Sequence, residues 1–305
     1  MDFPISSEHV NVAYLVIIGF IIGVFGGFFG VGGSFLAGPA LFAVGIPMNI
    51  VVGTDLAHIV GKSVVAAKRH RALGNVDIKL GLIMAIGTIA GVETGAQAIQ
   101  YLKRLGNVDK VVGIAFVIVL IAISAFVAWE SRETFHLQTR RGTRNTKSKK
   151  DESAFSHVSK RVQQFKLWPM IAFPHSGIKA ISLWVILAVA YLGGVFSGFL
   201  GGGAGYVRMP SLVYVLGVPT HIAVGTDLFE IVISAGYGMV THSLKGNVDI
   251  MIALVMNTGA AIGAQIGATC TEYFSGPKLR MAFIPLPLIG AALVIFKLIT
   301  GQHLK

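Results

Sequence analysis

The sequence is poor in charged residues and nearly without cysteine, and each shortage excludes a class of protein. Only 13% of the 305 residues are charged, whereas globular proteins have roughly 25%, so a soluble fold would lack polar groups for its surface. The single cysteine, Cys270, excludes an internal disulfide and a cysteine-based zinc site. No HExxH motif or nucleophile elbow is present, and Gly61-Lys62-Ser63 lacks the earlier glycine of a phosphate-binding loop, because position 56 is Leu56. The sequence therefore predicts no enzyme, no metal site and no cofactor.

Apolar residues are abundant instead. They make up 54% of the chain, and apolar runs of about 20 residues recur, the length that crosses roughly 30 Å of hydrocarbon. Residues 1–10 contain no Lys or Arg, so the first run, 10–29, is expected to be a retained span and not a secretory signal. We therefore expect an all-α polytopic membrane protein.

One long segment occurs twice. The copies begin GVFGGFFGVGG at Gly23 and GVFSGFLGGGA at Gly194, and both continue with a proline, Gly-x-Pro, Gly-Thr-Asp-Leu and Gly-Asn-Val-Asp-Ile at a nearly constant offset. Such self-similarity indicates an internal repeat. We expect two homologous half-bundles, residues 1–129 and 180–305, joined by a linker at 130–179.

Further spans are predicted at residues 48–71, 78–102, 108–129, 250–273 and 281–299. Gly87, Gly91 and Gly95 match Gly259, Gly263 and Gly267, and this spacing of small residues is typical of tight helix packing in membranes. Asp77 and Asp249 are predicted N-caps, and His70 and His242 are expected at interfaces or in hydrogen bonds.

The segments 34–46 and 205–216 are too short for ordinary spans and contain a proline. If they cross, each half has five spans, the halves are inverted and the N-terminus is external. If they are re-entrant, each half has four spans, the halves are parallel and both termini are cytoplasmic. Inverted repeats are common among transporters with broken helices, which favours the first arrangement.

Several ionisable residues lie within the predicted spans. Asp55, His58 and Lys62 share one helix face, and Asp227, Glu230 and Ser234 occupy the matching positions. Intramembrane charges usually face a bundle interior or a wet cavity, but they also pair with one another, and the sequence does not favour either interpretation for Asp55 and Lys62. The candidate coupling or pore-lining residues are Asp55, His58, Glu93, Asp227, Glu230 and Gln265. Because no nucleotide motif is present, we hypothesise that protons drive the transport.

An anion site is predicted at the repeated glycines. An oxyanion within a membrane needs positive charge or N–H donors, and glycine turns before helix N-termini supply donors. Lys62 and Arg208, which each occur in one half only, are the predicted sources of positive charge. The alternative is that Lys62 pairs with Asp55 and that Arg208 extends to a membrane surface. The candidate substrate-binding residues are Gly30, Gly32, Gly33, Thr54, Lys62, Gly201, Gly202, Gly203, Arg208 and Thr226, with helix capping as the alternative for the two threonines. Replacing Lys62 or Arg208 by Gln is expected to weaken anion binding without loss of folded protein.

The segment 130–169 is basic. It holds ten basic and four acidic residues, a net charge of 10 − 4 = +6. Basic loops stay in the cytoplasm, so the linker is expected there, largely solvated or touching acidic lipid headgroups at residues 140–150. Nucleic acid is not expected as a partner, whereas membrane lipid is, and a homodimer is left open.

The set of repeated motifs resembles the TauE/SafE family, the sulfite exporter family. The resemblance rests on Gly26-Gly27-Phe28-Phe29-Gly30-Val31-Gly32-Gly33, the following proline and Gly-x-Pro, Gly53-Thr54 and Gly74-Asn75-Val76-Asp77, with their partners in the second half. It implies a multi-pass inner-membrane transporter for a small, often sulfur-containing anion such as sulfite or a sulfonate. Two homologous halves with broken segments also suit alternating access. The alternatives are a passive anion channel and a non-transporting scaffold that acts through the basic linker.

Overall fold

The computed structural model describes residues 10–140, 156–165, 167–274 and 276–300. Within these residues, eight helices are long and apolar enough to cross a membrane, which confirms the predicted all-α polytopic class. They are α1 (Val12–Phe29), α3 (Met48–Ala72), α4 (Ile78–Arg104), α5 (Val108–Arg140), α7 (Leu183–Leu200), α9 (Thr220–Leu244), α10 (Ile250–Cys270) and the segment Met281–Thr300, which includes α12 (Pro285–Thr300). A 3₁₀ turn (Thr271–Tyr273) extends α10, and α11 (Gly276–Phe283) precedes α12.

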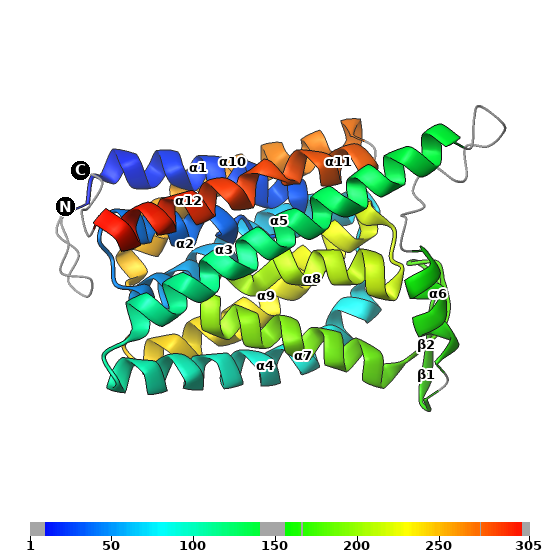
Figure 1. The fold of residues 1–305 in the computed structure, drawn as a ribbon, viewed down its shortest axis with the longest axis horizontal. Helices are drawn as coiled ribbons and strands as arrows, with labels where there is room; N and C mark the ends of the chain where they lie inside the picture. The colour runs from blue at the N-terminus through cyan, green and yellow to red at the C-terminus, as the bar shows by residue number, and fades with distance from the viewer. Residues whose placement is uncertain (1–9, 141–155, 166, 275, 301–305) are drawn as a thin grey trace.

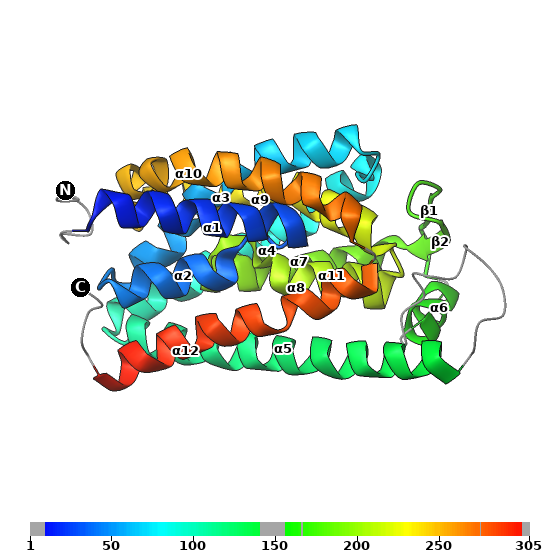
Figure 2. The ribbon, with the colours of Figure 1, turned by 90° about the horizontal axis from the view of Figure 1, so that it is seen from above.

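Short helices follow both glycine turns. They are α2 (Ser34–Ala43) and α8 (Gly205–Ser211), and a π-helical turn (Leu212–Leu216) continues α8. At 1.5 Å per residue, α2 is only about 15 Å long, half of what a crossing needs. The Tyr14 hydroxyl donates to the Ala40 carbonyl over 3.1 Å, so α2 runs back along α1 toward the end where α1 begins (Figure 2).

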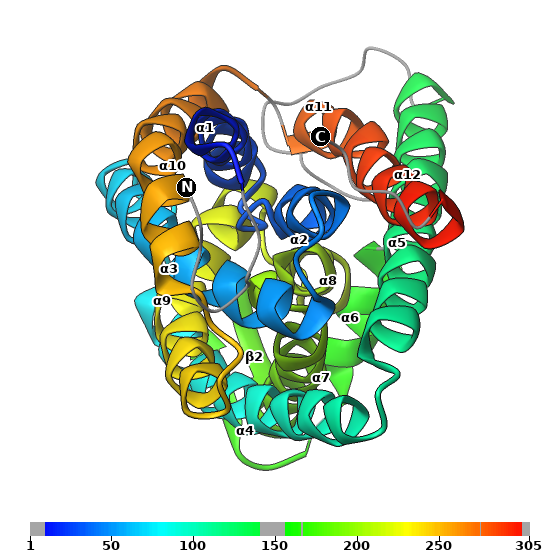
Figure 3. The same cartoon turned by 90° about the vertical axis from the view of Figure 1, so that its left-hand side faces the viewer.

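The long helices pack in pairs that join the two sequence halves. Helix α1 lies along α10, α4 along α7, α3 along α9, and α5 along α12 (Figure 3). The matching glycines of α4 and α10 face α7 and α1, and a Cβ at Gly91 would lie only 2.2 Å from the Tyr191 carbonyl oxygen. The predicted small-residue faces are therefore helix contact surfaces, and each half is completed by helices of the other.

The central helices α3 and α9 make matched contacts with the opposite half. The backbone N–H of Asp249 donates to the Thr54 hydroxyl, and that of Asp77 donates to the Thr226 hydroxyl, each over 2.9 Å. Thr54 lies near the start of α3, whereas Asp249 follows the end of α9, so the two helices run in opposite directions. Asp77 and Asp249 also accept hydrogen bonds at the starts of α4 and α10, as expected of N-caps.

Two further contacts bear on the direction of the halves. The His70 ring lies 3.0 Å from the Gly27 carbonyl at one end of the bundle, and the His242 ring lies 3.1 Å from the Gly198 carbonyl at the other. The start of α1 and the end of α12 lie at one end, opposite α6 and the hairpin (Figure 1). These observations support the inverted arrangement, which stays a prediction.

The described part of the linker is folded onto one end of the bundle. Helix α5 continues past the expected boundary at residue 130, so Glu130 is a buried helical residue that accepts a 2.9 Å hydrogen bond from the Tyr214 hydroxyl. Helix α6 (Ser156–Gln164) is followed by an antiparallel hairpin of β1 (Met170–Phe173) and β2 (Ile178–Ser182). The Ser176 hydroxyl donates to the Asp77 carboxylate over 2.6 Å, and Gln163 donates to the Leu216 carbonyl over 2.9 Å. Residues 141–155, the centre of the predicted lipid contact, lie outside the described residues.

Candidate functional site

The two glycine turns meet in the interior, between α3 and α9. A Cβ at Gly32 would lie 2.1 Å from the Ile59 Cδ1 atom and 3.5 Å from the Gly202 carbonyl oxygen, and one at Gly205 would lie 2.6 Å from the Val31 Cα atom. At Gly32 the φ angle is also positive, and neighbouring atoms leave no room for a side chain, so only glycine fits there. The structure thus brings together all six predicted glycines, which have φ between 66° and 84°: Gly30, Gly32, Gly33, Gly201, Gly202 and Gly203.

Arg208 joins two carboxylates of α9 beside these turns. Its Nε donates to Asp227, and its Nη1 lies 2.6 Å from a carboxylate oxygen of Glu230. All three side chains have no exposed surface, so Arg208 does not extend to a membrane surface. The Ser234 hydroxyl donates to Glu230 over 3.3 Å. The second half therefore holds a buried group of one cation and two carboxylates.

The first half holds its charges in a row along α3. The Nδ1 atom of His58 lies 3.1 Å from the Lys62 ammonium and 3.5 Å from the Asp55 carboxylate. All three side chains are buried. His58 thus stands between the two charges, which do not form the direct pair that the sequence left open.

Other candidate residues lie away from this cluster. The Thr54 and Thr226 hydroxyls accept hydrogen bonds from backbone N–H groups of the opposite half and do not cap their own helices. Glu93 is 36% exposed and lies 3.3 Å from Lys245, and Gln265 is exposed on α10. The structure does not bring Glu93 or Gln265 to the buried charges.

Tyr206 is a residue of this region that the sequence analysis missed. Its side chain is fully buried on α8, it interacts electrostatically with Asp55, and its hydroxyl has no hydrogen-bond partner among the described residues. The matching residue of the first half is Phe35. Lys62 and Arg208 were found because each is a polar residue present in only one of the two copies. The same comparison would also have found the Tyr206 hydroxyl.

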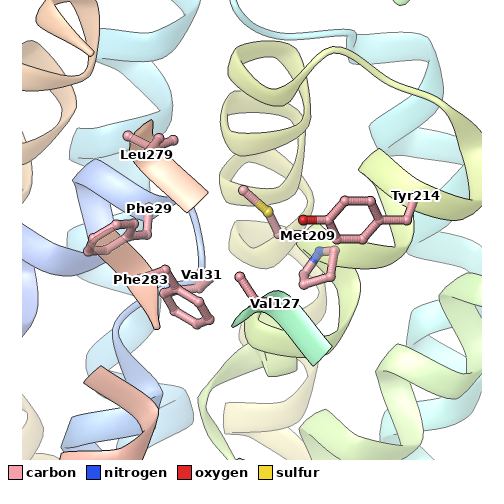
Figure 4. Close-up of a pocket in the computed structure, with 8 residues that line it drawn as sticks. Phe29, Val31, Val127, Met209, Tyr214, Leu279 and Phe283 are labelled. Carbon is pink, nitrogen blue, oxygen red and sulfur yellow. The ribbon is translucent and has the colours of Figure 1, made fainter. Parts of the chain in front are cut away.

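Two apolar hollows adjoin α8. One lies between the end of α1, α5, α8 and α11, where Phe29 and Phe283 face Met209 and Tyr214 (Figure 4). The other lies between α5 and α8, and Tyr206 contributes to its lining. Neither lining includes a charged side chain. The polar chemistry is therefore concentrated at the buried charges beside the glycine turns.

Comparison with known proteins places the chain in a family. A family model described as "Sulfite exporter TauE/SafE" matches residues 15–294. The chain belongs to this family. The TauE/SafE chain is 25% identical over 290 residues to the "Probable membrane transporter protein YunE" of Bacillus subtilis, covering 92% of this chain and 96% of that protein. It is 24% identical over 284 residues to the "Probable membrane transporter protein YdhB" of the same organism, covering 92% and 99%. No solved structure matches.

These matches confirm the family expected from the repeated motifs. Together with the eight long apolar helices, they identify this TauE/SafE protein as a multi-pass membrane protein of a transporter family.

Proposed function

We propose that this protein is a secondary transporter that carries a small anion, such as sulfite or a sulfonate, across the inner membrane by alternating access. The observation that carries the proposal is the pair of buried cations, Lys62 and Arg208, beside two glycine turns that meet in the interior. Family membership supports membrane transport, and the buried cations support an anionic solute, because hydrocarbon offers an anion no compensating charge.

The chemistry of Arg208 suits an oxyanion. A guanidinium presents its donors in a planar fork that matches two oxygens of a sulfite or sulfonate group, whereas an ammonium acts as a point charge. Nη2 of Arg208 has no hydrogen-bond partner among the described residues. An anion at the glycine turns can therefore accept hydrogen bonds from Nη2 while the backbone N–H groups of the turns approach it closely.

The packing suggests which parts move. Because α1 is tightly packed on α10 and α4 on α7, the two sequence halves cannot separate as rigid bodies without breaking these glycine contacts. Alternating access by rocking of repeat-related units therefore uses the α1–α10 pair and the α4–α7 pair as its units, with α3 and α9 between them.

Flux measurements test the proposal. The purified protein in liposomes is expected to take up radiolabelled sulfite and methanesulfonate with saturation, and to accumulate them above the external concentration when an ion gradient is imposed. Uptake that only equilibrates the anion under every gradient would indicate a passive channel. No flux of either anion in correctly folded protein would contradict anion transport and favour the scaffold.

A further inference from the structure

The buried charges of the site do not balance. On α3, α8 and α9 the buried charged side chains are two cations, Lys62 and Arg208, and three carboxylates, Asp55, Asp227 and Glu230, a sum of 2 − 3 = −1 with the histidines neutral. The arginine keeps its proton in proteins. An anion that enters this site would raise the negative charge further in a medium that screens charge poorly.

The surroundings of Glu230 supply no further cation among the described residues. Helix α3 offers Asp55, His58 and Lys62, and α8 offers Tyr206 and Arg208. On α4, the Thr88 hydroxyl lies beside Glu230 and donates to the Met84 carbonyl, while Glu93 is bound to Lys245. Helix α7 carries no charged residue, and Tyr214 of the π-helical turn is bonded to Glu130.

Resting on the proposed function, we infer that each anion enters together with one proton, which Glu230 takes up. Protonation removes the charge of Glu230 and weakens its contact with Nη1 of Arg208, so that the guanidinium can turn this nitrogen to the anion. The charge of the site then stays at −1, because the added proton compensates a monovalent anion and the loaded site keeps the charge of the empty one. Transport is thus an electroneutral symport of proton and anion.

Glu230 suits this role better than Asp227 for two geometric reasons. The hydroxyls of Ser234 and Thr88 lie beside its carboxylate, and a hydroxyl oxygen can accept a hydrogen bond from the protonated acid. Asp227 is held by Nε of Arg208, and its other oxygen lies against the backbone of Gly205. The repeat partner of Glu230 is His58, so both halves place a side chain that can carry a proton at the same position.

The experiment uses liposomes containing the full-length protein and radiolabelled methanesulfonate, a strong acid that stays monovalent at every pH tested. We expect accumulation with an acidic exterior at zero membrane potential, acidification of the lumen during uptake, and no accumulation with a potential alone. Glu230→Gln mimics the protonated acid, so we expect at least a tenfold loss of pH-driven accumulation and retained exchange of labelled for unlabelled anion. Glu272→Gln, which removes a partly exposed carboxylate 3.9 Å from Arg69, should behave as the parent.

Each other outcome is decisive. Parental pH-driven accumulation by Glu230→Gln would overturn the assignment to this residue. Proton coupling would be overturned if uptake by the parent depended on a membrane potential or a Na⁺ gradient and not on a pH gradient. It would also be overturned if uptake left the luminal pH unchanged. Both results hold even if the variant fails to fold. Absence of methanesulfonate exchange and net flux in the folded parent would instead contradict the proposed sulfonate transport, and the coupling with it.

Discussion

Arg208 is the residue that joins the two buried carboxylates of α9. It is the cation that contacts both Asp227 and Glu230. Removing one partner from a buried ion pair leaves an uncompensated charge, which costs about 3–5 kcal/mol. The structure therefore changes the expectation for this position, because loss of the arginine affects folding as well as anion binding.

We predict that Arg208→Gln sharply reduces the yield of monodisperse protein in detergent and lowers its thermal midpoint. Adding Glu230→Gln to the same chain should restore part of the stability, since one of the two stranded charges disappears. Size-exclusion chromatography and thermal unfolding of the parent and both variants measure this. An Arg208→Gln protein as stable as the parent would show that the carboxylates do not need the arginine.

Lys62 offers a cleaner test of anion binding, because its hydrogen-bond partner is the ring of His58 and not a carboxylate. Lys62→Gln should weaken sulfite binding by more than tenfold, a change of about 1.4 kcal/mol, while the protein stays folded. Lys245→Gln is the matched control, since Lys245 pairs with the partly exposed Glu93. The apparent affinity from transport kinetics is the measurement, and an unchanged affinity in Lys62→Gln would place the site elsewhere.

At the scale of the helices, stability depends on glycines at the contacts between the halves. Gly91 and Gly194 approach each other across α4 and α7, where a Cβ at Gly91 would lie 2.8 Å from the Cα atom of Gly194. In membranes, where lipid tails are as apolar as helix surfaces, such close packing is a main source of helix association.

Gly91→Ala is therefore predicted to lower the thermal midpoint of the protein, because the added methyl group would meet backbone atoms that cannot move without separating α4 from α7. Gly236→Ala on α9 is the control, since a Cβ there would meet no atom within 4 Å. Alanine is a better helix former than glycine, so the control should be as stable as the parent or slightly more so. Equal destabilisation by both substitutions would argue against the packing explanation.

At the scale of the whole molecule, the described part of the linker lies at one end of the bundle, opposite the start of α1 and the end of α12. The hairpin and α6 occupy one end, and the start of α1, the end of α12 and the turn between α4 and α5 occupy the other (Figure 1). Because basic segments stay in the cytoplasm, we expect the linker end to face the cytoplasm and the opposite end to face outward.

Single cysteines test this orientation in a Cys270→Ser background. Asn107, in the turn between α4 and α5, and Lys179, in the hairpin, are both exposed. An impermeant maleimide added to intact spheroplasts should label Asn107→Cys and leave Lys179→Cys unlabelled until the membrane is opened. Labelling of both positions, or of Lys179→Cys alone, would contradict the proposed orientation.

The sequence by itself determined the membrane-spanning helices of this protein. Helix spans follow from the length of apolar runs, helix starts from Asp77 and Asp249, and the sharp turns from repeated glycines, and each of these signals acts within a few residues along the chain. The family followed from the same local motifs. The pairing of Ser176 with Asp77 had no such signal, because neither residue is unusual for the surface of a loop.

Only the tertiary structure decided how these elements meet. Asp77 and Thr226 lie 149 residues apart in the chain, and nothing in the local pattern of either predicts their hydrogen bond. The sequence around Arg208 likewise did not determine whether its side chain lies at a membrane surface or in an anion site. Its contact with two carboxylates depends on how α8 is held against α9 by packing across both halves. The net charge of the site is therefore a property of the folded molecule and not of any single segment.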